Sequence, residues 1–422
     1  MRGRLLVVGA AALIALVLGV VLGTSGGDDD GPPATATEPP SLDPVAQALA
    51  ATAPVSAGWR ERGVDLTSYQ PEVFASADAA AQLDRIKATG STTVSIVVTW
   101  YQPDKAADDV QPDGAKSATE DGVRAIAAAA AQRGMTVALK PHVDVLDGTF
   151  RGQIAPRDPA AWMRSYTGFV TRMADLATAI GATTFVVGTE LETLSGRTAD
   201  WRALIAQVRQ RFTGRLTYAA NWVAEAERVR FWDALDLIGI DAYMPLTKDD
   251  PDPTVAELVR GWQPWRTRLA SLSASVHRPV LFTELGYPSR LGAADRPSQE
   301  GDGAVSQPAQ ARLYEAAFRV FEDVPWFRGV WWWDWPADGG DPARDAGSYT
   351  PAGKLAERTM TRWLATAPAA APEPATPDGA VTGPAPTTGP AATPDTTPAV
   401  TVTTTVTVTT PAPAPSPGTV AP

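Results

Sequence analysis

The chain has 422 residues, of which 44% are hydrophobic and 20% are charged, so it holds enough apolar material for one large domain or two ordinary ones. Its formal net charge of -11 argues against nucleic acid as a partner. The sequence contains no cysteine and only two histidines, His142 and His277. This composition excludes disulfides, thiolate chemistry and a histidine-rich metal site.

The N-terminal sequence is typical of an export signal. Arg2 and Arg4 precede an uncharged apolar stretch over residues 5–23, and three aspartates follow at 28–30. We expect residues 1–23 to be a signal peptide or an N-terminal membrane anchor, and the lack of a clear cleavage motif favours the anchor. The chain is therefore expected to be extracellular or on the cell surface, with residues 5–23 as a membrane tether.

Proline, alanine and threonine dominate two further segments, residues 24–58 and residues 366–422. Neither has the apolar periodicity needed to bury a core, so both are predicted to be disordered: the first as a linker, the second as a glycosylated stalk or an inert tail. One folded domain is then expected over residues 59–365, and we expect it to be a monomer.

Eight short apolar, β-branched or aromatic stretches alternate with longer amphipathic segments in this domain. The predicted strands cover residues 63–69, 92–101, 136–145, 184–192, 216–222, 237–244, 279–287 and 329–335. Helices are expected over residues 160–180, 198–212, 254–272, 307–321 and 351–364, and another between a capping box at Ser117-Ala118-Thr119-Glu120 and Gly134. Eight alternations predict a (β/α)8 TIM barrel of the α/β class rather than a doubly wound sheet.

Enzymes on this fold place their chemistry at the C-terminal ends of the strands, and two predicted strands end in glutamate. Glu190 ends the fourth strand and Glu284 ends the seventh. Two carboxyl groups about 5 Å apart fit retaining glycoside hydrolysis, in which one protonates the leaving oxygen and the other attacks the anomeric carbon. The alternative is that each glutamate pairs with an arginine at the barrel mouth. Glu192 is the rival of Glu190 for the acid/base role.

Other strand-end residues are expected to bind substrate. Tyr243 is expected to hydrogen-bond Glu284, the alternative being an ordinary core tyrosine. Alternation along the last strand would place Trp331, Trp333 and Trp335 on one face, with Trp333 and Trp335 as flat surfaces for sugar rings. The expected substrate-binding set is Trp100, Lys140, His142, Asp144, Asn221, Trp222, Tyr243, Trp333 and Trp335. Lys140, His142 and Asp144 share one strand face and either bind sugar hydroxyls or form an internal salt-bridge network.

Seven motifs in chain order carry a resemblance to a known family. They are GVDLTSYQ at 63–70, VVTWYQ at 97–102, KPHVDVLDGTFRGQI at 140–154, VGTELE at 187–192, GIDAYMPL at 239–246, TELGYPS at 283–289 and GVWWWDW at 329–335. With these motifs the sequence resembles glycoside hydrolase family 113, the β-mannanase-like barrels of clan A. The resemblance implies that Glu190 is the acid/base and Glu284 the nucleophile. The clan commonly has asparagine before the acid/base, whereas this chain has Thr189, so the usual hydrogen bond to the sugar 2-hydroxyl must come from elsewhere or be missing.

The sequence thus predicts a retaining glycoside hydrolase that acts without metal or cofactor. The expected substrate is a β-linked polysaccharide or oligosaccharide of the β-mannan or β-glucan type, and the expected mechanism is double displacement by two glutamates. One alternative is a barrel that binds cell-wall polysaccharide without cleaving it. The other is a metal-dependent hydrolase built on His142, Asp144 and Asp241.

Overall fold

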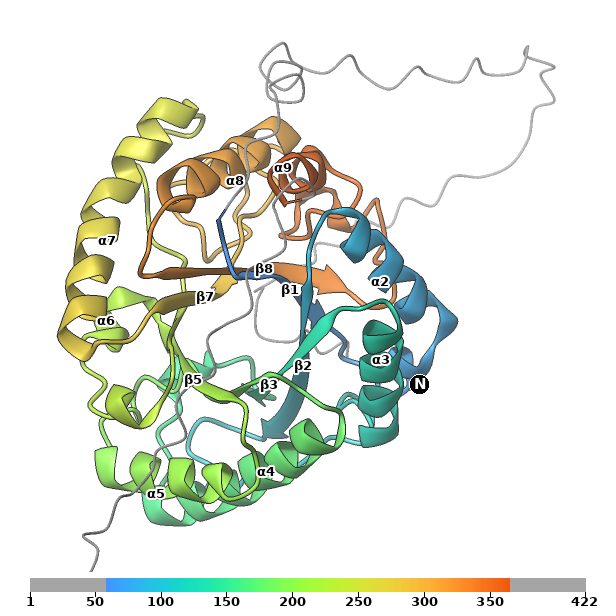
Figure 1. Cartoon of the computed structure of the whole chain (residues 1–422), viewed down its shortest axis with the longest axis vertical. Helices are drawn as coiled ribbons and strands as arrows, with labels where there is room; N and C mark the ends of the chain where they lie inside the picture. Colours follow the sequence, from blue (N-terminus) through green and yellow to red (C-terminus); the bar gives the residue numbers. More distant parts are fainter. Residues whose placement is uncertain (1–57, 365–422) are drawn as a thin grey trace, which may run out of the picture. The chain divides into compact units, whose positions relative to one another are not determined.

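Eight parallel strands close into a barrel in the computed structural model, which describes residues 58–364 (Figure 1). The strands follow one another around the ring in chain order, and β8 pairs with β1. Their bounds are β1 Glu61–Thr67, β2 Thr93–Gln102, β3 Thr136–Val145, β4 Thr184–Thr189, β5 Arg215–Asn221, β6 Ile238–Asp241, β7 Val280–Leu285 and β8 Phe327–Pro336. The predicted (β/α)8 barrel is confirmed.

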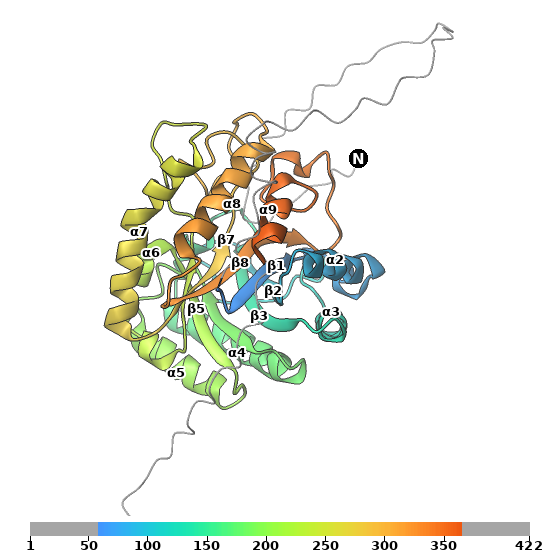
Figure 2. The ribbon, with the colours of Figure 1, turned by 45° about the horizontal axis from the view of Figure 1, so that its top comes forward.

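Helices surround the ring of strands on its outside (Figure 1). Their bounds are α2 Ala77–Ala88, α3 Glu120–Gln132, α4 Pro159–Ala179, α5 Thr198–Arg209, α6 Trp222–Ala226, α7 Val255–Val276, α8 Gln307–Phe321 and α9 Leu355–Leu364, with four short 3-10 helices, η1 Val73–Ala75, η2 Arg151–Gln153, η3 Trp232–Ala234 and η4 Asp345–Gly347. Figures 1 and 2 both place α2 beside β1 and β8, where the ring closes.

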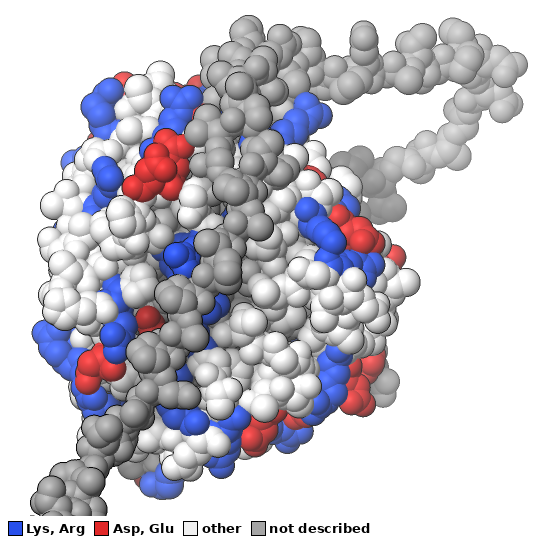
Figure 3. Space-filling model, viewed as in Figure 1, with Lys and Arg blue, Asp and Glu red and all other residues white. Residues whose placement is uncertain are grey.

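The predicted signal or anchor, nearly all of the predicted linker and the predicted tail lie outside the described residues. Within residues 58–364, every helix is too short or too polar to span a bilayer. On the face drawn in Figure 3, the described basic and acidic side chains lie interspersed rather than in large areas of one sign.

The start of α3 differs from the expected capping box. Thr119 is the N-cap, and its side chain accepts a hydrogen bond from the Gly122 amide. The Ser117 hydroxyl instead donates to the carbonyl oxygen of Thr99 on β2. The expected box was wrong because Ser117 lies before the helix. Gly134, with φ of 69°, follows the end of α3 as expected.

The interior of the barrel is packed with small residues around one large ring. A buried cluster inside the strands comprises Ala138, Val186, Ala219, Leu237, Leu281 and Trp331. Trp331 is in contact with Gly63 of β1, where an added Cβ would lie 2.4 Å from the indole. The glycine is required there because the indole occupies the space of a side chain. This cluster lies below the strand ends where the predicted site residues lie.

Candidate active site

Glu284, near the end of β7, is held by side chains from two other strands. Lys140 on β3 donates to its Oε1 at 2.6 Å, and the Tyr243 hydroxyl, just after β6, donates to its Oε2 at 2.7 Å. The predicted hydrogen bond from Tyr243 is therefore confirmed. Glu284 is only 3% exposed, and both of its oxygens are positioned by these buried donors. An anchored carboxylate of this kind is suited to nucleophilic attack.

Lys140 lies at the centre of a buried group of charges. Its Nζ is also 2.8 Å from the Thr283 carbonyl oxygen, 3.6 Å from Asp65 and 3.7 Å from Asp241. Burial alone would lower the pKa of the Lys140 ammonium, but the carboxylates of Asp241, Asp65 and Glu284 raise it above its ordinary value. The ammonium is thus charged and occupied by protein groups. Of the two roles expected for Lys140, the structure supports the internal salt-bridge network.

Glu190 follows β4 directly and has a left-handed backbone, with φ of 54°. Its amide donates to the Ala219 carbonyl oxygen of β5 at 2.8 Å, which holds this uncommon conformation in place. Burial and the neighbouring Glu284 carboxylate raise the pKa of Glu190 to about 7, against the lowering effect of Arg151 and Lys140. Glu190 can therefore exchange a proton near neutral pH, which an acid/base catalyst must do.

Arg151 is a site residue that the sequence reasoning missed. It begins η2 after β3, is 4% exposed, and donates to Glu190 Oε2 at 2.8 Å and to Asp144 Oδ1 at 2.6 Å. The contact with an arginine that was considered for the glutamates is thus present at Glu190. The only signal in the sequence was an arginine within the loop that follows a polar strand end.

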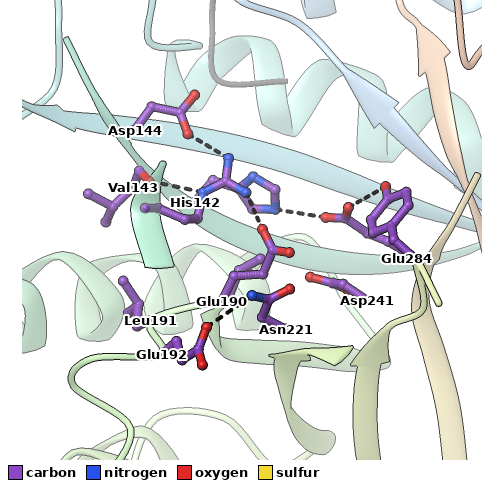
Figure 4. Close-up of polar contacts among 12 residues, drawn as sticks. His142, Val143, Asp144, Glu190, Leu191, Glu192, Asn221, Asp241 and Glu284 are labelled. Carbon is purple, nitrogen blue, oxygen red and sulfur yellow. Dashed lines mark hydrogen bonds and ion pairs between the residues drawn. The ribbon is translucent and has the colours of Figure 1, made fainter. Parts of the chain in front are cut away.

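The carboxyl groups of Glu190 and Glu284 point toward one another in Figure 4. The Glu284 charge also contributes to the raised pKa of Glu190. The two predicted catalytic glutamates are therefore brought together at one end of the barrel. Their expected separation of about 5 Å stays a prediction.

Glu192, the rival acid/base, lies on the other side of the strand end. Its carboxylate accepts from Asn221 at 3.2 Å and is paired with Arg228. Glu192 is about one-third exposed, and Figure 4 shows its carboxylate beside Asn221 and farther from Glu284 than the carboxylate of Glu190. Asn221, predicted to bind substrate, is thus next to Glu192 at the end of β5.

Two of the predicted substrate-binding tryptophans do not face the site. Trp100 stacks on Phe169 of α4 with ring centroids 4.5 Å apart and lies under Arg172, because its position on β2 faces the helices. Trp335 is buried against α2, where its indole donates to Gln82 at 3.0 Å. Both expectations were wrong.

The error at Trp335 has a local cause in the pairing of β8 with β1. Val64 pairs with Trp332 and Leu66 with Trp335, so β8 has one residue more than β1 in this interval. A bulge of this kind reverses the alternation of side chains beyond it. Trp331 and Trp333 therefore face inward and Trp335 faces outward.

Aromatic side chains form one wall of the barrel mouth. A buried cluster of Val97, Tyr243, Trp333 and Tyr349 lies there, with Trp222 packed against it. Trp222 and Trp333 are where the sequence analysis expected them, whereas Tyr349, in the loop after β8, was missed. Tyr349 contacts Tyr243 edge to face with centroids 6.1 Å apart, so it supports the residue that holds Glu284.

His142 and Asp144 follow Lys140 on the inner face of β3. The His142 ring stacks on Trp333, and its Nε2 is 3.6 Å from Glu284 Oε1. Burial, together with Arg151 and Lys140, lowers the pKa of His142 well below its ordinary value, so the ring is neutral at pH 7. Asp144 is occupied by Arg151.

The metal site considered on His142, Asp144 and Asp241 is not formed. Asp144 is ion-paired with Arg151, and Asp241 accepts from Thr283 at 2.8 Å and lies beside Lys140. Among residues 58–364, no three His, Cys, Asp or Glu side chains are grouped to hold a metal ion.

A closed eight-stranded barrel with an anchored carboxylate and a proton-exchanging glutamate at its mouth is the arrangement of a barrel glycoside hydrolase. The family model of Glycoside Hydrolase Family 113 matches residues 67–354. The chain belongs to this family.

Solved structures agree with the family match. The GH113 β-mannanase of Alicyclobacillus acidocaldarius, in complex with ManMIm, is 30% identical, with a TM-score of 0.66 over 74% of this chain and 99% of that one. A complex of a GH113 β-1,4-mannanase is 27% identical, with a TM-score of 0.65 over 73% and 99% of the two chains. A fungal β-1,4-galactanase structure, 12% identical with a TM-score of 0.50 over 72% and 99%, shares the fold. Curated protein sequences gave no significant match.

Proposed function

We propose that this chain is a retaining glycoside hydrolase whose substrate is a β-1,4-linked mannan or mannooligosaccharide, with β-glucan as the second choice. The observation that carries the proposal is that two buried glutamates at the barrel mouth have different surroundings. Both oxygens of Glu284 are held by hydrogen bonds from Lys140 and Tyr243, while the raised pKa of Glu190 lets Glu190 hold a proton near neutral pH. Two carboxyl groups whose environments separate their roles are the requirement for double displacement.

In the proposed mechanism, Glu284 attacks the anomeric carbon while protonated Glu190 gives its proton to the glycosidic oxygen. The first sugar product leaves, and the second sugar remains bonded to Glu284. Water then attacks the same carbon and gives a proton to Glu190, which releases Glu284. Tyr243 and Lys140 hold Glu284 in place through both steps.

The choice of mannan is supported by the solved relatives, whose names describe β-mannanases. The polar wall of the mouth supports a sugar ligand. The Tyr101 hydroxyl and Asp144 Oδ2 are buried without a hydrogen-bond partner among the described residues, and Tyr101 pairs with Asp144 across β2 and β3. Buried polar atoms of this kind require a partner, which sugar hydroxyls would supply.

The proposal is tested with purified enzyme on mannan, glucan and other polysaccharides, and with three variants on an activated aryl mannoside and a mannooligosaccharide. Glu284→Ala is expected to abolish turnover and to keep much of the ligand affinity. Glu190→Ala is expected to slow the oligosaccharide far more than the aryl glycoside, and added azide is expected to restore turnover on the aryl glycoside.

Glu192→Ala is the matched control. It is expected neither to abolish turnover nor to slow the oligosaccharide selectively. Azide rescue in Glu192→Ala but not in Glu190→Ala would move the acid/base role to Glu192. Binding of a polysaccharide by wild-type protein without hydrolysis of any substrate would favour the binding-only barrel.

We also propose that the enzyme acts as a monomer outside the cell, with residues 5–23 as its membrane tether. This rests on the apolar segment between Arg4 and the aspartates at 28–30. Membrane fractions from cells that make the full chain, compared with a chain lacking residues 1–23, test the tether; equal distribution of both would overturn it.

A further inference from the structure

The guanidinium of Arg151 is fixed by the strand that precedes it and contacts only one catalytic group. Its Nε donates to the Val143 carbonyl oxygen at 3.1 Å, and its Nη2 donates to Asp144 Oδ1 at 2.6 Å. Both partners belong to the end of β3. The remaining nitrogen, Nη1, is thereby directed at Glu190 Oε2, 2.8 Å away.

This contact has a consequence for where a proton can be placed on Glu190. An arginine guanidinium has only donors and keeps its charge at all working pH values. Oε2 of Glu190 must therefore accept from Arg151 whether the carboxyl group is ionised or neutral. A proton on Oε2 that pointed toward Arg151 would place two donor hydrogens against each other, which is unfavourable.

We propose that Arg151 is a positioning residue that keeps Glu190 Oε2 as a hydrogen-bond acceptor throughout turnover, so that the proton transferred in catalysis is carried on Oε1. This inference rests on the proposed function of Glu190 as acid/base. It assigns to one loop residue the orientation of the catalytic acid, a role that clan resemblance did not indicate for Arg151.

The two steps balance with Oε1 as the proton carrier. In the first, the Oε1–H bond breaks, the proton goes to the glycosidic oxygen, that oxygen leaves the anomeric carbon, and a carboxylate oxygen of Glu284 bonds to the carbon. In the second, a water oxygen bonds to the carbon, the bond to Glu284 breaks, and the water proton returns to Oε1. Arg151 gains and loses no proton.

Arg151 also opposes protonation of Glu190, since a cation beside a carboxyl group favours its ionised form. Burial and Glu284 act in the other direction, and their sum raises the pKa of Glu190 to about 7. Three other titratable groups influence Glu190 or are influenced by it. They come from β3, from the last residue of β6 and from the loop after β8: Lys140, Asp241 and Tyr349. Removal of Arg151 is therefore expected to raise the pKa of Glu190 further.

The test compares the pH dependence of kcat/KM for wild type, Arg151→Met and Arg151→Lys on a mannooligosaccharide and on an aryl mannoside with an activated leaving group. In Arg151→Met the alkaline limb for the oligosaccharide is expected to move up by about 1 pH unit or more. Its maximum is expected to fall by roughly 10–100-fold, because a misdirected acid loses part of the usual 10²–10⁴-fold contribution. The activated glycoside needs little protonation and is expected to lose far less.

Arg151→Lys separates charge from geometry. It is expected to return the alkaline limb of the pH profile toward the wild-type position. The kcat/KM for the oligosaccharide is expected to stay low, because one ammonium cannot reproduce the three anchored donors of the guanidinium. Arg312→Met is the matched control, since Arg312 is also buried, donates to the Pro253 carbonyl oxygen at 3.0 Å and pairs with Asp252. It is expected to lower stability with no movement of the limb.

Arg151→Met leaves Asp144 buried without its cation, so the double variant Arg151→Met/Asp144→Asn is measured as well. It removes both charges and is expected to show the same shift of the limb. An equal loss on both substrates with the limb unmoved, in a folded variant, would overturn the proposal and leave Arg151 a structural role.

A measurement without turnover separates this proposal from the proposed function. Protein labelled with ¹³C at the glutamate carboxyl carbon is titrated by NMR, and the Glu190 signal is assigned by its loss in Glu190→Gln. A higher midpoint in Arg151→Met than in wild type supports the control of the Glu190 proton by Arg151, even if no glycoside is hydrolysed and the proposed function fails. An unchanged midpoint refutes it even if the wild-type enzyme is active.

Discussion

The hydroxyl of Tyr243 makes one hydrogen bond, 2.7 Å long, to Glu284. Hydrogen bonds to charged groups contribute about 1.5–3 kcal/mol, so Tyr243→Phe is expected to lower kcat by roughly 10–100-fold if this bond strengthens in the transition state. The measurement is steady-state kinetics on an aryl mannoside. Tyr166→Phe, which removes a buried hydrogen bond to the Val187 carbonyl oxygen, is the control and should keep kcat. Equal losses in the two variants would refute a specific role for Tyr243.

The raised pKa of Glu190 also makes the stability of the protein depend on pH. Its pKa is raised to about 7 in the folded protein, above the ordinary value of 4.5, so the folded state binds this proton more tightly than the unfolded state. Stability from Glu190 is therefore present below pH 4.5 and is lost as pH rises toward 7, by up to about 3 kcal/mol.

The Glu190→Gln variant cannot titrate at this position and is expected to keep its stability over this range. Its free energy of unfolding, relative to that of wild type, should therefore increase between pH 4.5 and pH 7. Urea unfolding at several pH values measures it. Glu192→Gln, at an exposed site two residues on, is the control. A constant difference between Glu190→Gln and wild type would contradict the raised pKa.

At the residue scale, the sequence indicated that Glu190, Glu284 and Tyr243 lie at strand ends, and the structure brings the three together there. It could not choose a role for Lys140, because the carboxylates around its Nζ come from β1, β6 and β7, far apart in the chain. It missed Arg151 because η2 is a single turn in a loop, with no periodicity to mark which side chain returns to the strand ends.

At the scale of elements, β8 shows how a bulge divides the roles of similar residues. Trp333 belongs to the aromatic cluster at the mouth, and Trp335 belongs to the packing between β8 and α2. Trp333→Phe is expected to raise KM with little loss of stability. Trp335→Phe is expected to lower the free energy of unfolding by about 1–2 kcal/mol with KM unchanged, since it loses a buried hydrogen bond and apolar area.

Each tryptophan serves as the control for the other, and the comparison needs only KM on an oligosaccharide and a urea unfolding curve for each variant. A rise in KM for Trp335→Phe equal to that for Trp333→Phe would restore the alternation expected from the sequence and contradict the bulge.

Long amphipathic helices were well predicted, and α8 has the predicted bounds, Gln307–Phe321. Their position follows from a buried face that repeats every turn. Caps were less predictable because several serines and threonines near a helix start can fill the role. The capping box that the structure does contain joins Thr254 and Glu257 at the start of α7.

At the scale of the whole domain, residues 58–364 include every element that closes the barrel. β1 pairs with β8, and α9 packs on α8 through Trp363, which stacks on Phe318 with centroids 5.3 Å apart and donates to Glu315 at 2.8 Å. The fragment 58–364 is expected to unfold within a degree or two of the full chain, as the composition of the flanking segments predicts.

A second fragment that ends at residue 354 removes α9 and serves as the control. It is expected to melt at least about 5 °C lower, because Phe318 and Glu315 lose a large buried partner. Calorimetry of the three proteins measures both effects. A loss of several degrees in the fragment 58–364 would show that a flanking segment packs on the barrel.

The contacts of Lys140 with Thr283 and Glu284 join β3 to β7 through the inside of the ring, and Asp65 and Asp241 lie beside the same ammonium. Replacement of Lys140 alone would leave three acidic side chains buried without their common cation. Glu284 and the folded ring thus depend on the same buried ammonium. An engineer who wants a folded but inactive sugar-binding barrel should therefore neutralise Glu284 and leave Lys140 in place. Evolution toward a binding-only descendant would meet the same constraint.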